Sequence, residues 1–146
     1  MIAVDTNILV YAHRADSEWH LPARDAIRSL AEGRPTWALP WPCLHEFLAI
    51  VTHPRIFEPP STMEEALRQV EAWIGSPSVV VIGEGPEHWK TLATVVRAGS
   101  IRGPKVHDAR IASICLDSGV TEFLAHDRDF SRFPTLRVRN PLLSRD

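Results

Sequence analysis

Two aspartates come directly after apolar segments that are typical of buried strands. Asp5 follows Met1–Val4, and Asp127 follows Glu122–Ala125 with His126 between them. An apolar run without alternation is typical of a central strand that is buried on both faces of a parallel sheet. Open parallel sheets bind ligands at the carboxyl ends of their strands, so both acids occupy positions where a ligand would bind. The alternatives are that Asp5 or a neighbour caps the next helix and that Asp127 belongs to a polar turn.

Two further acids lie in line with the apolar stripes of predicted helices. Glu46 shares a helical face with Ala49 and Ile50, and Asp108 shares one with the apolar residues three, four and seven positions later. A lone ionised carboxylate that faces a core is costly, so such groups are paired or bind a metal. The alternative is that each acid lies in a first turn, where it is partly exposed and favoured by the helix dipole.

The four acids are predicted to meet at one edge of a sheet. In a doubly wound fold, the strand ends and the first turns of the helices that follow them open on the same carboxyl edge. Four carboxylates there repel each other strongly unless divalent cations neutralise them. Hard cations such as Mg²⁺ or Mn²⁺ prefer oxygen ligands, and no Cys and His residues have zinc-type spacing. The sequence therefore predicts a site for one or two such ions, formed by Asp5, Glu46, Asp108 and Asp127.

The elements that must position these acids alternate between strands and helices. Four apolar segments and one edge segment are predicted as strands, at about residues 1–4, 37–39, 79–82, 121–125 and 136–138. Six segments with apolar residues at helical spacing are predicted as helices, at about residues 8–15, 22–32, 43–52, 63–74, 86–98 and 106–117. This alternation predicts an α/β fold over residues 1–146: one doubly wound domain with a central, mostly parallel sheet of four to five strands flanked by helices.

Local signals make some of these expectations sharper. Ser61 followed by Glu64 is a capping-box pattern that predicts the start of the fourth helix. Trp89 is predicted to share the apolar face of the fifth helix with residues three, four and seven positions later. Three histidines directly precede proposed acids. Adjacent helical residues point about 100° apart, so the two on helices should not share a face with their acids. We interpret all three as structural or as supporting the ligands, and not as general bases. These histidines are His45, His107 and His126.

The composition limits the classes of function. At 146 residues, with 45% hydrophobic and 23% charged residues, the chain is large enough for one domain with a real core. A net charge of −2 excludes nucleic-acid binding by bulk charge alone, so any such binding requires a local basic patch. Cys43 and Cys115 favour free thiols in a reducing compartment. The chain shows no leader and no apolar run of roughly 18 residues, so we expect a cytoplasmic protein without a membrane segment.

Several segments together resemble the ordered motifs of PIN-domain ribonucleases, and within them the VapC toxins of bacterial toxin–antitoxin pairs. These segments are residues 4–9 (VDTNIL), 46–47 (EF), 108–112 (DARIA), 127–134 (DRDFSRFP) and 139–142 (RNPL). The resemblance spans the whole chain and implies a PIN-like sandwich. It implies that Asp5, Glu46, Asp108 and Asp127 form the family's acidic quartet, with Thr6 or Asn7 as helpers and Asp129 as the alternative fourth acid. Ala125 stands where many members carry Thr or Ser, which puts a supporting hydroxyl in doubt.

The same resemblance implies a function. We expect Mg²⁺-dependent hydrolysis of RNA phosphodiesters, with Mn²⁺ as an alternative ion, to give 5′-phosphate and 3′-hydroxyl products. A homodimer and inhibition by a cognate VapB-type antitoxin are implied as well, and Trp19, Trp37 and Trp41 are candidates for a partner contact. Because acids repel RNA, cations at the rim must bind its phosphates. The candidates are Arg97, Arg102, Lys105, Arg110, Arg128 and Arg132.

Two other functions remain open at this stage. A non-catalytic RNA-binding or scaffold domain with the same fold would be expected to lack at least one of the four acids, and none is missing. An aspartate-nucleophile phosphatase is also doubly wound and uses Mg²⁺. That chemistry needs a second aspartate two residues after Asp5, where this chain has Asn7.

Overall fold

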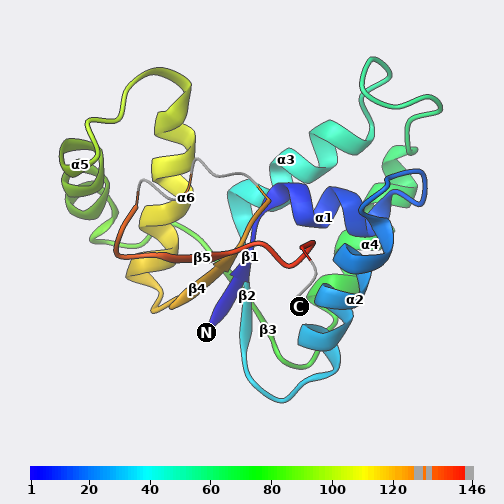
Figure 1. The fold of residues 1–146 in the computed structure, drawn as a ribbon, viewed down its shortest axis with the longest axis horizontal. Helices are drawn as coiled ribbons and strands as arrows, with labels where there is room; N and C mark the ends of the chain where they lie inside the picture. Colours follow the sequence, from blue (N-terminus) through cyan, green and yellow to red (C-terminus); the bar gives the residue numbers. More distant parts are fainter. Residues whose placement is uncertain (127–129, 131–132, 144–146) are drawn as a thin grey trace.

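A parallel sheet organises the part of the chain that the computed structural model describes, which is residues 1–126, 130 and 133–143 (Figure 1). Its strands are β1 (Ile2–Val4), β2 (Trp37–Pro40), β3 (Val79–Ile82), β4 (Glu122–Leu124) and β5 (Arg137–Arg139). They lie in the order β3-β2-β1-β4-β5, and every neighbouring pair is parallel. The predicted α/β class and the edge position of the last strand are therefore confirmed.

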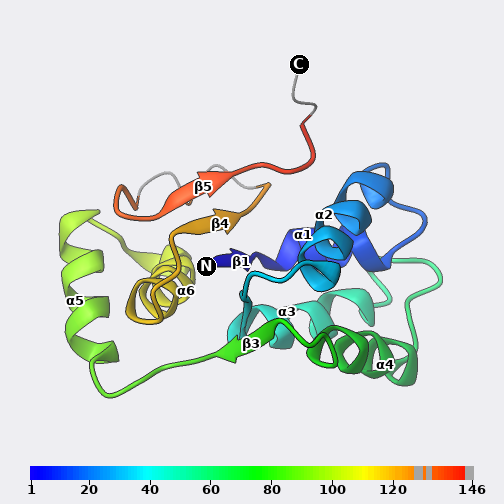
Figure 2. The same cartoon turned by 90° about the horizontal axis from the view of Figure 1, so that it is seen from below.

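The helices pack on both faces of this sheet. They are α1 (Thr6–His13), α2 (His20–Glu32), α3 (Trp41–Val51), α4 (Met63–Ile74), α5 (His88–Ala98) and α6 (Val106–Asp117), with a 3₁₀ turn η1 (Gly103–Lys105) before α6. Figure 2 shows α5 and α6 on one side of the sheet and α1 to α4 on the other. No helix in the described ranges combines the length and the apolar character that a membrane crossing requires.

The central strand β1 is short and buried, as its unbroken apolar sequence predicts. Ala3 and Val4 are fully buried between β2 and β4. At the carboxyl end of β1, the backbone N–H of Asp5 donates to the carbonyl of Leu124 at 2.9 Å. This bond carries the sheet pairing one residue beyond β1 and places Asp5 beside the end of β4.

Three helices begin two residues earlier than predicted, and one of them is α2, which starts at His20 instead of Pro22. Helix α1 starts at Thr6 instead of Ile8, because Asp5 already occupies the N-cap position in extended conformation (φ −78°, ψ 160°). Helix α3 starts at Trp41 instead of Cys43, because Pro42 lies inside its first turn and does not precede the helix. Proline fits there because the N–H groups of a first turn have no partner within the helix, so its missing N–H costs nothing. By contrast, α6 has the predicted limits, and Gly119 adopts a positive φ of 78° in the turn that follows it.

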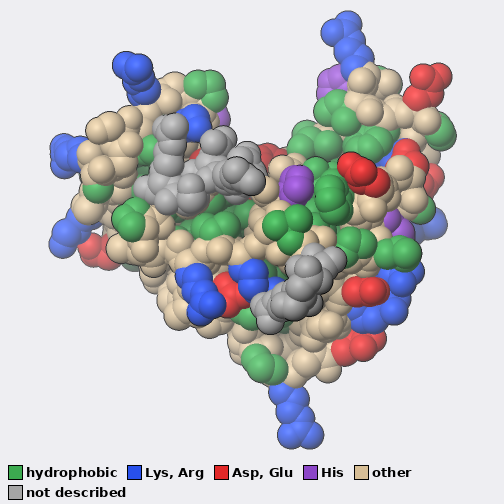
Figure 3. Space-filling model, in the orientation of Figure 1, with side chains coloured by type: hydrophobic (Ala, Val, Ile, Leu, Met, Phe, Trp, Pro, Cys, Tyr) green, Lys and Arg blue, Asp and Glu red, His purple; other side chains and the backbone are tan. Residues whose placement is uncertain are grey.

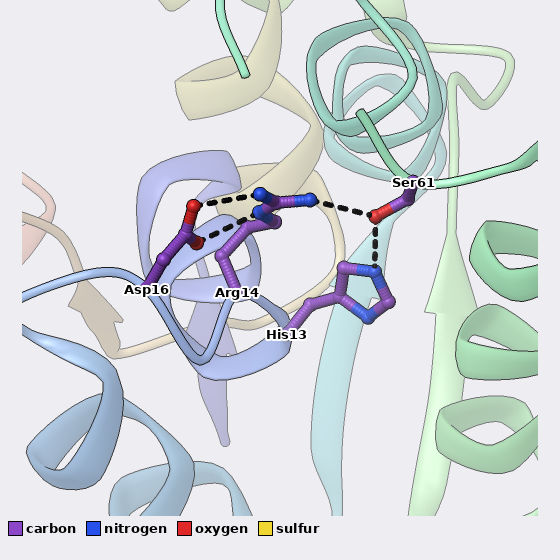
Figure 4. Close-up of polar contacts among 4 residues, drawn as sticks. All are labelled: His13, Arg14, Asp16 and Ser61. Atoms are coloured by element: carbon purple, nitrogen blue, oxygen red, sulfur yellow. Dashed lines mark hydrogen bonds and ion pairs between the residues drawn. The ribbon is translucent and has the colours of Figure 1, made fainter. Parts of the chain in front are cut away.

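The capping box predicted at Ser61 is wrong by one residue. Thr62 is the N-cap of α4, and its hydroxyl accepts from the backbone N–H of Glu65 at 3.1 Å. Ser61 is buried and faces α1 instead, with its hydroxyl 2.9 Å from Nε2 of His13 and 3.3 Å from a guanidinium nitrogen of Arg14 (Figure 4). Ser61 and Thr62 both fit the capping-box pattern, because each has a glutamate three residues later. Since the hydroxyl of Ser61 contacts α1, Thr62 is the residue that caps α4.

The predicted apolar face of α5 is only partly correct. Trp89 is 77% exposed, whereas Leu92 and Val96 pack against the core. The hydroxyl of Thr91 donates to the carboxylate of Asp117, the last residue of α6, at 2.6 Å. Trp89 therefore lies outside the contacts that hold α5 against the core.

Among the tryptophans proposed as partner contacts, Trp37 is excluded. It is fully buried in β2 and belongs to the core. Trp19 is half-buried, and Trp41 is 44% exposed at the start of α3. The short strand 37–40 therefore uses its tryptophan to fill the interior, which the sequence alone does not distinguish from a surface role.

The link between Ser61 and α1 predicts a stability effect. Ser61→Ala leaves a guanidinium nitrogen of Arg14, whose side chain is 12% exposed, without this acceptor, and should lower the free energy of unfolding by about 1–3 kcal/mol. Thr62→Ala removes only the cap bond and should cost about 1 kcal/mol. Urea denaturation measures both.

Thr94→Ala is the control, because that hydroxyl is exposed and bonds its own helix, so a change within about 0.5 kcal/mol is expected. A Ser61→Ala effect no larger than that of Thr94→Ala would contradict the prediction.

Candidate functional site

The carboxylate of Asp5 is buried at the carboxyl edge of the sheet. Only 4% of the residue is exposed, and its side chain makes no capping hydrogen bond to α1. The capping interpretation of this side chain is therefore wrong. The thiol of Cys43, in the first turn of α3, donates to Asp5 Oδ1 at 3.9 Å. A carboxylate held in this way is costly in isolation, which is the condition under which such groups are paired or bind a cation.

Helices α1 and α3 bring the second acid to this edge. The hydroxyl of Thr6, which is 4% exposed, donates to Glu46 Oε2 at 2.7 Å. Thr6 directly follows Asp5, so this bond links Glu46 to the same point of the sheet. Glu46 itself is exposed, which leaves its carboxylate open to solvent on the outer side of the site. The predicted proximity of these two acids is thus achieved through a threonine.

Two thiols lie beneath these carboxylates. Burial raises the pKa of Cys43 well above its usual range, and the negative charges of Asp5 and Glu46 raise it further, while a hydrogen bond with Thr6 acts in the opposite direction. Burial and then the charge of Asp5 raise the pKa of Cys115, in α6, to about 12. Both thiols are free, as expected, and they stay protonated beside the acids.

Cys43 is the neighbour of the acids that sequence reasoning missed. It precedes Glu46 by three residues, a spacing that places both on one helical face, so the signal was available in the sequence. The sequence does predict that Cys115 shares a helical face with Asp108, seven residues earlier.

The third acid, Asp108, lies in the first turn of α6 and is half-buried. In Figure 1 the start of α6 lies across the carboxyl edge of the sheet from α1 and α3. Figure 3 shows that the molecule is hollowed along this edge, between the part formed by α5 and α6 and the part formed by α1 to α4. The three described acids therefore come from elements that border one hollow.

The basic residues proposed to bind phosphate lie in different environments. Arg97 and Arg102 are exposed, and Lys105 is half-buried at the end of η1. Arg110 forms an ion pair with Glu84, the second residue after β3, and this hydrogen-bonded pair lowers the pKa of Glu84. Because a carboxylate already neutralises its guanidinium, Arg110 is a poorer phosphate ligand than the sequence predicts.

The fourth acid lies outside the described residues. This applies to both candidates, Asp127 and Asp129, and to the neighbouring cations Arg128 and Arg132. Within residues 1–126, 130 and 133–143, no group of three or more His, Cys, Asp and Glu side chains is close enough together to hold a metal ion. The donors that the structure does describe at this edge are mainly carboxylate and hydroxyl oxygens, which suit a hard divalent cation.

The histidines beside the acids take different positions. His45 and His107 are exposed, and the ring of His45 lies 6.2 Å from that of Trp41. His126 is half-buried, and its Nδ1 lies 3.1 Å from the side-chain nitrogen of Asn140.

The sequence and the fold are similar to those of known proteins. The PIN domain family matches residues 2–136. Ribonuclease VapC43 of Mycobacterium tuberculosis is 34% identical over 142 residues, which cover 97% of this chain and 96% of that protein. Ribonuclease VapC48 of the same organism is 30% identical over 137 residues, or 94% of each chain. In the crystal structure of VapBC2 from Rickettsia felis bound to a promoter DNA fragment, a chain 21% identical has the same fold, with a TM-score of 0.66 and coverage of 96% of this chain and 98% of that one.

The buried thiols give a direct test of the geometry around Asp5. Because the thiolate is the reactive form and the pKa of Cys115 is about 12, only about one Cys115 in ten thousand is ionised at pH 8. We expect neither thiol of the native protein to react with Ellman's reagent while free glutathione reacts to completion, and both to react in guanidinium chloride. The Cys43→Ala variant reports Cys115 alone. A thiol of the native protein that reacts as fast as glutathione would show that solvent and reagent reach the region around Asp5, and would contradict the buried geometry.

Proposed function

Because the chain belongs to the PIN-domain family and, within it, to the VapC ribonucleases, we propose that it is a Mg²⁺-dependent endoribonuclease and the toxin of a toxin–antitoxin module. The observation that carries this proposal is the buried carboxylate of Asp5 at the carboxyl edge of the sheet, with Thr6 binding Glu46 beside it. Nucleases of this family generally depend on divalent metals, which agrees with the oxygen donors at this edge.

The acids are proposed as the metal ligands. Asp5, Glu46 and Asp108 would hold the ion together with Asp127 or Asp129. When bound, such an ion lowers the pKa of a coordinated water and stabilises negative charge on the attacked phosphate. Thr6 orients Glu46 through its 2.7 Å hydrogen bond, and Asn7 remains a proposed helper in the first turn of α1. Mn²⁺ is the alternative ion, because it accepts the same oxygen ligands.

RNA is the proposed substrate, and the cations at the rim are the proposed phosphate ligands. Arg97 and Arg102 are exposed, so a ligand in solution can reach both side chains. Lys105 precedes the first turn of α6 and lies three residues before Asp108. Arg110 contributes only if its ion pair with Glu84 opens, and Arg128 and Arg132 complete the proposed set.

The partners are proposed from the family. We infer that a cognate VapB-type antitoxin inhibits the protein and that two copies form a dimer; the R. felis neighbour is itself part of a VapBC complex. Exposed Trp41 is a surface residue of the kind that partner contacts use. We further propose that residues 1–146 form a single PIN domain and that the protein acts in the cytoplasm.

The nuclease proposal is tested by RNA cleavage with the purified protein. Single-stranded RNA of mixed sequence should be cleaved in Mg²⁺, remain intact in EDTA, and be cleaved again when Mg²⁺ is restored. Asp5→Asn keeps the size of the side chain and removes its charge, so cleavage should fall to the level without enzyme. Thr6→Val removes the hydrogen bond to Glu46 and should slow cleavage by about 10- to 100-fold.

The matched control for these variants is Asp25→Asn. Asp25 is an exposed carboxylate of α2 whose side chain is 63% accessible, so its loss should leave cleavage unchanged. Equal cleavage by the parent and by Asp5→Asn, or equal cleavage in Mg²⁺ and EDTA, would refute the metal mechanism. A folded protein that binds RNA and cleaves none under any of these conditions would favour the non-catalytic scaffold.

A further inference from the structure

Three aromatic rings gather beside the carboxyl ends of β1 and β4, and we call them the aromatic cluster. Tyr11 comes from α1, Trp19 is the N-cap of α2, and His126 lies two residues after β4. The ring centroids of Tyr11 and His126 are 5.8 Å apart in an edge-on arrangement, and those of Trp19 and His126 are 5.4 Å apart at a tilt of 47°. All three residues are half-buried, so the cluster packs against the core and is also partly accessible to solvent.

Polar contacts hold this cluster in place. The backbone N–H of Leu142 donates to Asn140 Oδ1 at 3.0 Å, so the amide nitrogen of Asn140 faces His126. That nitrogen lies 3.1 Å from His126 Nδ1, and this contact fixes the orientation of the ring. His20 Nδ1 lies 3.0 Å from the carbonyl of Tyr11 and ties the start of α2 to α1. Rings that are already fixed lose little conformational entropy when they bind a ligand.

The cluster lies next to the proposed acidic site. The hydrogen bond from Asp5 to Leu124 sets the ends of β1 and β4 side by side, and His126 is only two residues further along. Tyr11 is six residues after Asp5, which corresponds to about 9 Å along a helix. A nucleotide that neighbours a phosphate at the acids is therefore within reach of these rings.

The charge of the chain makes such a contact valuable. With a net charge of −2 and an acidic site, the protein cannot rely on bulk electrostatics to hold RNA. Stacking of bases on aromatic rings is independent of charge and tolerates every sequence, because each base has a π-face. Single strands and loops offer such faces, whereas the bases of a duplex are already stacked on each other.

We propose that the aromatic cluster of Tyr11, Trp19 and His126 is a subsite for an unpaired nucleobase of single-stranded RNA, next to the phosphate at the acidic site. This proposal rests on the proposed ribonuclease function and adds to it a selection for unpaired RNA. Trp19 supplies the largest ring. Asn140 is a positioning residue that fixes His126.

The test measures binding of a 12-nucleotide single-stranded RNA of mixed sequence in the Asp5→Asn background, where hydrolysis does not interfere. Trp19→Ala should weaken binding by about 5- to 150-fold, the range that one stacked base supplies. Trp19→Phe keeps a ring and should stay within about threefold of the parent. Trp89→Ala is the matched control, because this more exposed tryptophan of α5 lies outside the cluster, and it should have no effect. Binding of the corresponding RNA duplex should not change in Trp19→Ala.

A second measurement changes the RNA as well as the protein. Each base of the RNA is replaced in turn by an abasic site, and one position should reproduce the loss seen in Trp19→Ala. At that position the two changes should not add, because both remove the same contact. Single-stranded RNA should also quench part of the tryptophan fluorescence of the parent, and this part should be missing in Trp19→Phe.

The outcomes separate this proposal from the nuclease proposal. Trp19→Ala that is folded by circular dichroism and binds single-stranded RNA as the parent does would overturn the aromatic subsite, whatever the cleavage assay gives. Abasic losses that simply add to the Trp19→Ala loss would overturn it too. If RNA binding is unchanged while Trp19→Ala weakens association with a co-expressed VapB-type protein, the cluster is a protein contact and the proposal is wrong. Failure of Asp5→Asn to abolish cleavage refutes the metal site, and the Trp19→Ala comparison is then made with a single-stranded RNA that gel electrophoresis shows to be intact after the measurement.

Discussion

The buried carboxylate of Asp5 is the constraint on which the rest of the site depends. A charge at the end of a central strand, only 4% exposed, is unfavourable unless neighbouring groups stabilise it. The backbone of Asp5 is fixed by its bond to Leu124, so the side chain cannot withdraw without breaking the sheet. Its neighbours include two protonated thiols, which donate weakly and carry no charge. The divalent cation that we propose would compensate this charge directly, because such ions prefer the oxygen donors found at this edge.

Helix α1 connects this constraint to α3 and to the segment that precedes α4. At its start, Thr6 binds Glu46 of α3. At its end, His13 and Arg14 bind Ser61, which precedes α4, and Arg14 also pairs with Asp16 at 2.7 Å (Figure 4). Eight residues of helix thus tie the acidic edge to the outer helices at two points. Because contacts with Ser61 fix the carboxyl end of α1, the position of its first turn depends on packing at a distance from the acidic edge.

The sequence predicts the helices and strands more directly than it predicts where they end. The limits of β3 and α6 are correct because β-branched content and helical periodicity act over several residues. The predicted N-cap of α4 is wrong because Ser61 and Thr62 are both good capping residues. Only the long-range contact of Ser61 with α1 decides which of them caps the helix. Trp89 is predicted on a packed face because periodicity gives the apolar face of α5 and does not reveal which of its turns reaches the core. Local signals therefore give the elements, while tertiary contacts decide their ends.

In the candidate site, too, local sequence signals predict the residues, and tertiary contacts decide what those residues bind. Spacing predicts that Asp5 and Glu46 approach each other, and the structure brings them together through Thr6, an interaction that no periodicity specifies. Spacing also offers Arg110 as a phosphate ligand, yet Glu84, which lies 26 residues earlier in the chain, neutralises it. With that cation engaged and a net charge of −2, electrostatic attraction alone is a weak source of affinity for a polyanion. If RNA is the substrate, as we propose, contacts with the bases would add to those with the phosphates, and the half-buried aromatic rings beside the acids are the groups that we propose for them.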